Sequence, residues 1–358
     1  MTTLFLVIVL FIILALFLCK GTNDKNEKAY LMICFMVMLI LHTFFNPEYS
    51  DNYFYKIGYG EYQSMSLFKV LQENSPSLKA ETGYRVLCKI LTYISKDWVF
   101  GMFVISLIML SGYYLVVRRY SSIAWLSVLI IMVGPFTQSL FVLRQHLAMG
   151  IILFSYPYIL QKKIVPYLII CFLAISCHQT AAVFLPTYFI YNVRKPSYII
   201  TLFLVLFFLF YYYFSFSFFL STAASIVMET ESYVDYYFEY DMESGTNNKM
   251  ALLLVTLLIM RIILMKKDFF KEGINRLMSI IMIIGTIFSV VGIGLMATSR
   301  LNMYYSEAAF IYIPNTFQYV KKKEIRTMCG IGYFLFFFYF MIKNASNGDM
   351  SEFWFFSK

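Results

Sequence analysis

The sequence contains little charge. Only 14% of its 358 residues are Asp, Glu, Lys or Arg, whereas 60% are hydrophobic and 20% are aromatic. Soluble globular domains carry about 25% charged residues, so the composition excludes an ordinary soluble domain and predicts a protein with many membrane-spanning helices. The net charge of +9 does not indicate nucleic-acid binding, because the positive residues are sorted by the predicted topology.

Several well-known motifs are also absent. The six cysteines stand singly, without CxxC or CxH spacing, so we expect neither a zinc site nor a disulfide framework. The chain lacks a P-loop, GxSxG, HExxH and a DxD metal-binding pair, and it lacks the repeated Gly/Pro-broken helices of many secondary transporters. We therefore expect a lipid substrate that carries its own activated leaving group, with no cofactor and no metal.

Apolar runs long enough to cross a bilayer recur along the chain. About 20 residues span the hydrocarbon core, which predicts an all-α polytopic membrane protein of about twelve helices in one domain over 1–358. The pair within 164–192 is short enough to form a tight or partly re-entrant hairpin instead. The predicted spans are 3–19, 29–45, 98–117, 121–137, 139–160, 164–177, 179–192, 197–220, 249–265, 277–298, 301–319 and 327–343.

Basic residues orient this predicted bundle. One set of loops carries seventeen basic and five acidic residues, and the opposite set carries nine basic and fourteen acidic residues. Because basic loops face the cytoplasm, we expect both termini outside. The first apolar run has no basic segment before it and is followed by Lys20, Lys25 and Lys28, which favours a spanning helix over a cleaved signal peptide.

The two long loops, at about 46–97 and 221–248, both lie on the predicted outer face. In the first loop, apolar residues recur at helical spacing over Tyr84–Ile94. This pattern predicts an amphipathic helix on the membrane surface, with Arg85, Lys89 and Lys96 as its polar residues. The apolar positions are Val86, Leu87, Ile90, Leu91 and Ile94.

Two arginines stand at the outer ends of apolar runs. Arg144 lies in LFVLRQHLAMGIILF, and Arg300 lies in GLMATSRLNMYYSEAAFIYIP. Inserting an arginine into the hydrocarbon region costs roughly 2.5 kcal/mol or more, and its planar fork of donors matches phosphate oxygens. We interpret both as ligands for pyrophosphate. The alternatives are a structural ion pair for Arg144 and snorkelling to the membrane surface for Arg300.

Other polar residues fall at the same predicted face. Gln145 directly follows the first arginine, and His178 joins two short predicted helices. This histidine is either a hydrogen-bonded structural residue, or it accepts a proton or donates a hydrogen bond to a phosphate. Tyr304 and Glu307 follow the second arginine at i+4 and i+7, which predicts that the three share one helix face. We expect Gln145 and Tyr304 to assist in pyrophosphate binding.

The first outer loop offers candidates for sugar binding. Asp51 and Tyr53 follow a helix-ending Asn-Pro, and Glu81 and Tyr84 lie in the segment ETGY at the start of the predicted surface helix. Glu81 is either a residue that begins this helix or a functional carboxylate. Carboxylates accept hydrogen bonds from hydroxyl groups, and aromatic rings such as Tyr53 and Tyr84 cover the apolar faces of sugars.

Five segments resemble the EpsG family of Wzy-like polysaccharide polymerases. The resemblance covers about residues 46–320 and implies a bacterial inner-membrane protein with a GT-C-like helical fold, whose active site faces the periplasm or the outside. Its expected partners are the bilayer, undecaprenyl-pyrophosphate-linked repeat units and a chain-length regulator. The segments are NPEYSDNYFY, ETGYRVL, VLRQHLAMGIILFS, CHQTAAVFLP and SRLNMYYSEAAFIYIP.

The same resemblance implies a reaction. A growing glycan is transferred from undecaprenyl pyrophosphate to the non-reducing end of another lipid-linked repeat unit. Arg144 and Arg300 then hold the pyrophosphate and stabilise the charge that develops as it leaves, while His178 deprotonates the attacking hydroxyl. The carboxylates that offer an alternative base are Asp51, Glu81 and Glu307.

Three other functions are less favoured. An O-antigen ligase-like enzyme uses the same donor but tends to carry a catalytic histidine in a late outer loop, and 221–248 contains no histidine. A flippase or exporter needs charges along a path to both leaflets, whereas the embedded charges here cluster on one side. A membrane acyltransferase needs a histidine towards the cytoplasm, and His178 is predicted on the opposite face.

Overall fold

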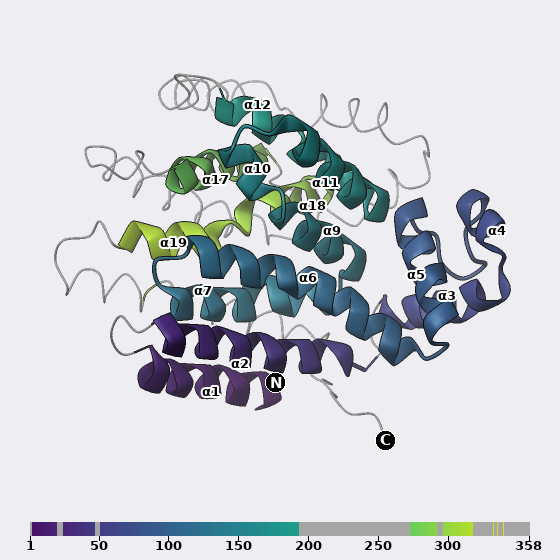
Figure 1. The fold of residues 1–358 in the computed structure, drawn as a ribbon, viewed down its shortest axis with the longest axis horizontal. Helices are drawn as coiled ribbons and strands as arrows, with labels where there is room; N and C mark the ends of the chain where they lie inside the picture. The colour runs from purple at the N-terminus through teal and green to yellow at the C-terminus, as the bar shows by residue number, and fades with distance from the viewer. Residues whose placement is uncertain are drawn as a thin grey trace. The chain divides into compact units, whose positions relative to one another are not determined.

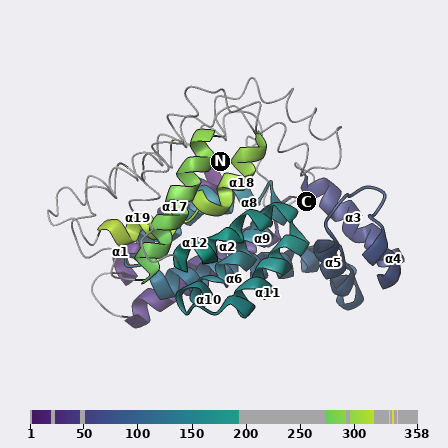
Figure 2. The same ribbon diagram turned by 90° about the horizontal axis from the view of Figure 1, so that it is seen from above.

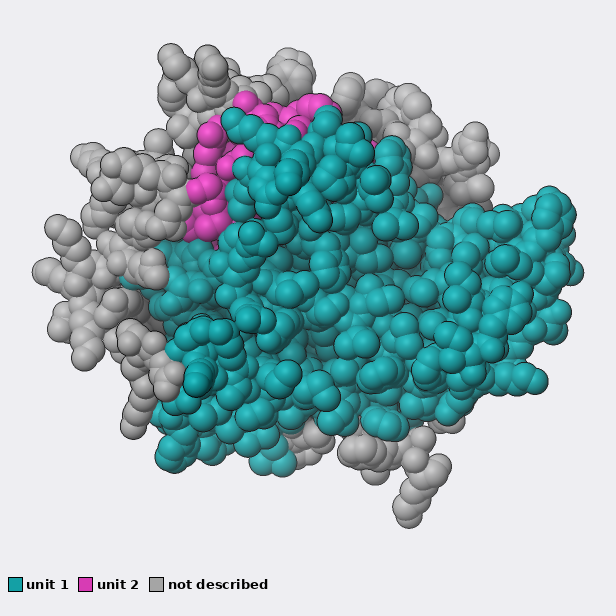
Figure 3. Space-filling view, viewed as in Figure 1, with its two compact units in different colours: residues 1–182, 313–358 teal, residues 183–312 magenta. Residues whose placement is uncertain are grey.

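The computed structural model describes residues 2–19, 24–46, 51–192, 273–291 and 296–317, with the single positions 332, 335 and 339. Over these residues the regular secondary structure is entirely helical, which confirms the predicted all-α class. The chain divides into two compact units, residues 1–182 with 313–358 and residues 183–312 (Figure 3). This division reflects contact density, so the single domain predicted over 1–358 stays a prediction.

The first unit is built on long apolar helices that lie side by side (Figure 1). In this unit α2 packs on α1 and α6, α6 packs on α9, and α9 packs on α11. Asp97 begins α6 by accepting a hydrogen bond from the backbone N–H of Val99 at 3.0 Å, which satisfies one of the free donors at a helix start. The helices are α1 (Thr2–Leu18), α2 (Asp24–Thr43), α6 (Trp98–Tyr120), α7 (Ala124–Ile131), α9 (Leu143–Leu153), α10 (Tyr156–Leu160) and α11 (Ile164–Cys177).

The predicted outer loop at 46–97 is largely helical. It forms α3 (Asn52–Ser64), α4 (Leu67–Gln72) and α5 (Thr82–Ile94). These helices pack on one another beside the N-terminal end of α6 (Figures 1 and 2). The helix predicted over Tyr84–Ile94 is confirmed as α5, its position on the membrane surface stays a prediction, and α3 and α4 were not predicted. In α3 the helical spacing of Tyr55, Tyr59 and Tyr62 is obscured by the other aromatic residues of the segment, and α4 is too short to show a period.

The polar face of α5 does not face water, which corrects the sequence interpretation. Arg85 and Lys89 are only 5% and 4% exposed, while Ile90 and Ile94 on the other side of the helix are exposed. The reason is that the two cations reach backbone carbonyls at the ends of the neighbouring helices. Lys89 donates to the carbonyl of Gln63 in the last turn of α3 at 3.1 Å.

Arg85 forms the matching contact with α4. It donates to the carbonyl of Leu71 in the last turn of that helix at 3.2 Å, and to the side-chain oxygen of Thr82 at 2.8 Å. The last carbonyls of a helix lack intrahelical partners and carry partial negative charge. The two cations of α5 therefore bind free carbonyls in the last turns of α3 and α4, and they join the three helices into one compact group.

Helices α6 and α9 approach so closely that glycine is required. A Cβ atom on Gly150 of α9 would lie 2.6 Å from the Cα atom of Met109 in α6. Small residues permit this close crossing of backbones in membrane-embedded helices. The crossing matters for the candidate site because α9 begins only a few residues earlier, at Leu143.

The segment between α7 and α9 is more irregular than the predicted spans 121–137 and 139–160. A π-helical segment, η1 (Met132–Phe136), contains Pro135 and is followed by the short helix α8 (Thr137–Ser139). Proline lacks the N–H needed for the regular helical hydrogen bond, and a π-helical turn accommodates this loss. The second predicted span is divided into α9 and α10.

The second unit contains α12 (Pro186–Asn192), α17 (Gly273–Val291) and α18 (Met296–Ser306). Helix α18 packs on α17, and the Tyr305 ring stacks on that of Phe288 with centroids 5.7 Å apart. The predicted span 301–319 is interrupted: Glu307 and Ala308 form a turn, and α19 (Ala309–Phe317) follows.

Within the described ranges, one helix is both long and apolar enough to cross a membrane, α6 with 23 residues. Shorter apolar helices cover Leu4–Leu18, Ala124–Ser139, Ile164–Cys177 and Gly273–Ser289. The count of about twelve spans is not confirmed and stays a prediction. The predicted spans 197–220 and 249–265, and the outer loop 221–248, lie outside the described residues, as does most of 327–343.

We predict that Gly150→Ala lowers the free energy of unfolding by about 1–3 kcal/mol, the usual cost of overpacking, because the new methyl group meets the backbone of α6. Thermal unfolding of the detergent-purified protein measures this effect. Gly60→Ala in α3 is the matched control, because a Cβ atom there meets nothing within 4 Å. Equal losses in the two variants would contradict the proposed crossing.

Candidate functional site

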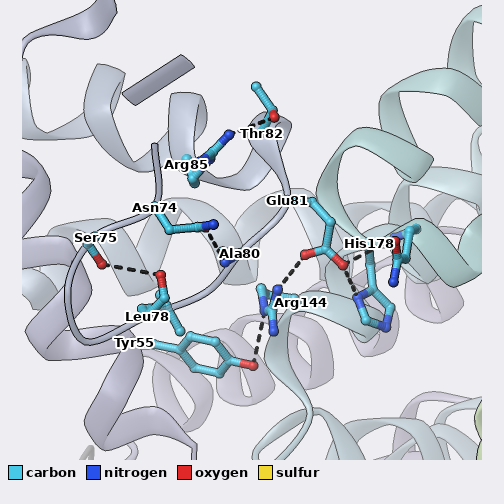
Figure 4. Close-up of polar contacts among 11 residues, drawn as sticks. Tyr55, Asn74, Ser75, Leu78, Ala80, Glu81, Thr82, Arg85, Arg144 and His178 are labelled. Carbon is cyan, nitrogen blue, oxygen red and sulfur yellow. Dashed lines mark hydrogen bonds and ion pairs between the residues drawn. The ribbon is translucent and has the colours of Figure 1, made fainter. Parts of the chain in front are cut away.

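Three of the residues singled out in the sequence meet in the first unit. Glu81 precedes α5, Arg144 is the second residue of α9, and His178 directly follows α11. Figure 4 shows the Glu81 carboxylate between the other two side chains, with Tyr55 of α3 beside Arg144. The site therefore gathers an anion, a cation, an imidazole and a phenol from four elements distant in sequence.

Glu81 bridges the other two residues through its two carboxylate oxygens. Its Oε2 atom accepts a hydrogen bond from Arg144, and its Oε1 atom lies 2.8 Å from Nδ1 of His178. Oε1 also accepts from the backbone N–H of Gln179 at 3.2 Å. Glu81 occupies the N-cap position of α5 but its side chain makes no capping hydrogen bond. The Glu81 side chain therefore pairs with Arg144 and His178 and does not cap α5, and its role as a functional carboxylate stays a prediction.

The segment that leads to Glu81 is held by its own hydrogen bonds. The side chain of Glu61 in α3 accepts from the backbone N–H of Ser77 at 3.1 Å and from its hydroxyl at 2.6 Å. Further along, Asn74 Oδ1 accepts from the backbone N–H of Ala80 at 2.8 Å (Figure 4). These bonds close the turn between α4 and α5, and they fix the backbone next to the carboxylate before any ligand binds.

Gly83 allows the start of α5 to approach the end of α11. A Cβ atom at this position would lie 2.6 Å from Cβ and 2.7 Å from the backbone carbonyl carbon of Ser176, closer than real Cβ contacts. Ser176 lies two residues before His178, and Gly83 lies two residues after Glu81. The absence of a side chain at Gly83 thus brings the carboxylate within reach of the imidazole.

Arg144 is supported by aromatic residues as well as by Glu81. Its Nε atom donates to the Tyr55 hydroxyl at 3.4 Å, and its guanidinium carbon lies 5.7 Å from the centre of that ring. Tyr55 is buried and rests against Tyr84, with ring centroids 5.8 Å apart. An arginine near an aromatic face gains cation–π stabilisation, so this pair of rings supports the guanidinium.

The site is partly shielded from water, and its charges are strongly coupled. The side chains of Arg144, Glu81 and His178 are 21%, 18% and 12% exposed. Burial by itself raises the pKa of the Glu81 carboxyl, but the hydrogen bond from His178 and the charge of Arg144 outweigh burial and lower this pKa to about 2. Glu81 is therefore ionised at neutral pH, which makes it a poor proton acceptor.

The charge of Glu81 fixes the tautomer of His178. An ionised carboxylate only accepts hydrogen bonds, so Nδ1 of His178 must donate to it. In the neutral imidazole, Nε2 then carries the free lone pair. This Nε2 atom is buried and has no hydrogen-bond partner among the described residues. A buried polar atom without a partner costs about 1–3 kcal/mol, and a ligand hydroxyl is one group that would satisfy it.

The structure places the other candidates of the first unit around these residues. Gln145 is buried in α9, next to Arg144. Asp51 is exposed at the start of α3, close enough to Tyr55 that its charge contributes, after burial, to a raised pKa of that phenol. The two rings proposed for sugar binding differ: Tyr53 is exposed, whereas Tyr84 is fully buried beneath Tyr55. Tyr53 presents its ring at the surface, and Tyr84 packs inside.

Arg300, Tyr304 and Glu307 belong to the second unit. Arg300 is half-buried and Tyr304 is buried, both in α18. Glu307 directly follows this helix, at the turn before α19, and its backbone N–H still donates to the carbonyl of Met303 at 3.3 Å. That all three side chains share one helix face stays a prediction. The participation of these residues in one site with Arg144 stays a prediction.

Two contributors to the site were missed in the sequence. Tyr55 was overlooked because NPEYSDNYFY was interpreted as a loop, although Tyr55, Tyr59 and Tyr62 recur at helical spacing on what proves to be the buried face of α3. Gly83 was quoted only as part of a motif. A glycine at the first turn of a helix, where it is not a C-cap, indicates close approach of another backbone. No group of three or more His, Cys, Asp or Glu side chains suited to a metal occurs within the described ranges.

A comparison with protein families now identifies the relationship. A model of the EpsG family matches residues 28–356. The chain belongs to the EpsG family. Membership makes it a membrane-embedded, polymerase-like protein of polysaccharide biosynthesis. No curated protein and no solved structure matches this EpsG-family chain, so the GT-C-like fold stays a prediction.

We predict that Gly83→Ala reduces polysaccharide formation by this EpsG-family protein up to about 100-fold, the loss that a misplacement near 1 Å can cause. The added methyl group forces the start of α5 away from α11 and so separates Glu81 from His178. Polysaccharide from cells with equal amounts of each variant in the membrane measures the effect. Gly60→Ala is again the control, and unchanged polymer from Gly83→Ala would show that this contact does not position the site.

Proposed function

We propose that this EpsG-family protein is a polysaccharide polymerase. It transfers a glycan from undecaprenyl pyrophosphate to the non-reducing end of a second lipid-linked repeat unit, at the outer face of the bacterial inner membrane. The observation that carries the proposal is the contact of Glu81 with both Arg144 and His178. A phosphate-binding cation and a proton acceptor thereby stand on either side of one carboxylate, as this reaction requires.

Arg144 binds the pyrophosphate of the donor in this proposal. One terminal nitrogen donates to Glu81 and Nε donates to Tyr55, whereas the second terminal nitrogen makes no hydrogen bond to any described residue. Guanidinium groups bind phosphate oxygens through parallel N–H bonds and remain charged in a low dielectric. Such a cation stabilises the negative charge that the pyrophosphate gains as it leaves.

His178 is the general base. The hydroxyl at the non-reducing end of the acceptor attacks the anomeric carbon of the donor glycan, and its proton passes to Nε2 of His178. The bond between the anomeric carbon and the pyrophosphate oxygen breaks, and undecaprenyl pyrophosphate leaves as an anion. The neutral tautomer fixed by Glu81 presents the lone pair for this step. Proton transfer of this kind contributes about 10²–10⁴-fold to a rate.

Arg300 supplies a second cation for the pyrophosphate, with Tyr304 beside it. This part of the proposal rests on their sequence positions at the outer end of an apolar run. Asp51 and Tyr53 are proposed to contact the sugars, because both are exposed near the start of α3. The predicted orientation places these groups on the outer face, where lipid-linked repeat units are polymerised and where a chain-length regulator would meet the protein.

We predict that cells lacking their own gene regain a ladder of long polysaccharide with the wild-type protein, but only single repeat units with Arg144→Lys or His178→Gln. Lysine keeps the charge of Arg144 without its fork of donors. Glutamine keeps a donor for Glu81 but accepts no proton. Gel analysis of surface glycan gives the result, with Arg118→Lys as a control at an exposed arginine.

The alternatives give different results in the same assay. If the wild-type protein restores surface glycan that was missing altogether, without a ladder, the protein attaches or moves repeat units and is a ligase or a flippase. If both variants form a normal ladder at equal protein levels, the proposed site is wrong.

A further inference from the structure

The position of Glu81 supports one further inference, which rests on the polymerase function proposed above. The sequence left this residue as a helix-start residue or a general base. The structure gives it neither contact: it makes no capping bond to α5, and its carboxylate is already paired on both oxygens. Its role must therefore be exerted through Arg144 and His178.

We infer that Glu81 is a positioning residue that competes with the donor pyrophosphate for Arg144 while it holds His178 as the base. One carboxylate thus sets both the strength of donor binding and the readiness of proton transfer. The Glu81 carboxylate is an internal anion that binds part of the guanidinium to which the pyrophosphate binds.

The negative charge of Glu81 makes it a competitor of pyrophosphate for Arg144. Arg144 and Glu81 are both mostly shielded from solvent, so their attraction is stronger than that of a surface pair. A pyrophosphate that binds the second terminal nitrogen of Arg144 brings negative charge close to the ionised Glu81. The carboxylate therefore weakens binding of the donor and also of the undecaprenyl pyrophosphate that must leave after each transfer.

The hydrogen bonds of Glu81 hold His178 in the form that acts as a base. The carboxylate receives Nδ1–H of His178 at 2.8 Å, and the backbone N–H of Gln179 holds the same oxygen. This arrangement leaves Nε2 of His178 as the acceptor and stabilises the imidazolium that forms when it takes a proton. A neutral amide at position 81 keeps the shape of the side chain but lacks the charge that stabilises the imidazolium.

We predict that Glu81→Gln binds undecaprenyl pyrophosphate roughly tenfold more tightly, equivalent to about 1.4 kcal/mol, yet turns over about 100-fold more slowly, within the range of a lost base contribution. Binding is measured with purified protein and undecaprenyl pyrophosphate, and turnover with the undecaprenyl-pyrophosphate-linked repeat unit in phospholipid vesicles. Glu73→Gln is the matched control, because Glu73 is an exposed acid at the end of α4.

Double variants assign each effect to its partner. In the Arg144→Lys background, Glu81→Gln should tighten binding much less, because the competition needs the fork of the arginine. In the His178→Gln background, Glu81→Gln should slow turnover no further. A purely structural role for Glu81 would weaken binding and turnover together, and it would do so in every background.

The outcomes separate the inference from the function on which it rests. If Glu81→Gln weakens binding of undecaprenyl pyrophosphate or leaves it unchanged, while Arg144→Lys and His178→Gln still abolish polymerisation, the competitive role of Glu81 is wrong and the polymerase site stands. If Arg144→Lys and His178→Gln do not impair polymerisation, the proposed site itself is wrong.

Discussion

The site depends on one carboxylate shared between a cation and an imidazole. Glu81, Arg144 and His178 are each largely shielded from water, and a shielded charge is stable only when it is paired. Separating α5, α9 and α11 would leave an unpaired carboxylate and an unpaired guanidinium. The electrostatic need for pairing therefore constrains the positions of three helices, and the backbone around them is built to meet that constraint.

The outer helices show how this is achieved. The buried cations of α5, Arg85 and Lys89, donate to backbone carbonyls that end α4 and α3 and not to Glu81. Glu81 thus remains available for Arg144 and His178. Gly83 permits the close approach to α11, and the hydrogen bonds of Glu61 with Ser77 and of Asn74 with Ala80 hold the chain before the helix. Packing and hydrogen bonding prepare the carboxylate, and electrostatics then fixes its partners.

The sequence predicted several parts of this arrangement because they break a pattern. Arg144 and His178 are conspicuous as polar residues at the ends of apolar runs, and α5 is visible from its helical spacing. Other residues of the arrangement do not stand out from their neighbours in the sequence. Tyr55 lies among many tyrosines, and the buried positions of Arg85 and Lys89 reverse the usual expectation that cations face water. The break of the predicted span 301–319 at Glu307–Ala308 was also missed, because no glycine or proline marks that turn.

The sequence by itself determined the class of protein and the set of candidate polar groups. An apolar chain with little charge must bury its backbone in helices, and it can hold few ionisable residues away from water. Only the tertiary structure decided which of those residues pair. Glu81 is 63 positions from Arg144 and 97 from His178, and from the sequence alone the helix dipole is sufficient reason for a glutamate at a helix start. Here packing brings a guanidinium and an imidazole, so the carboxylate serves the site and not the helix.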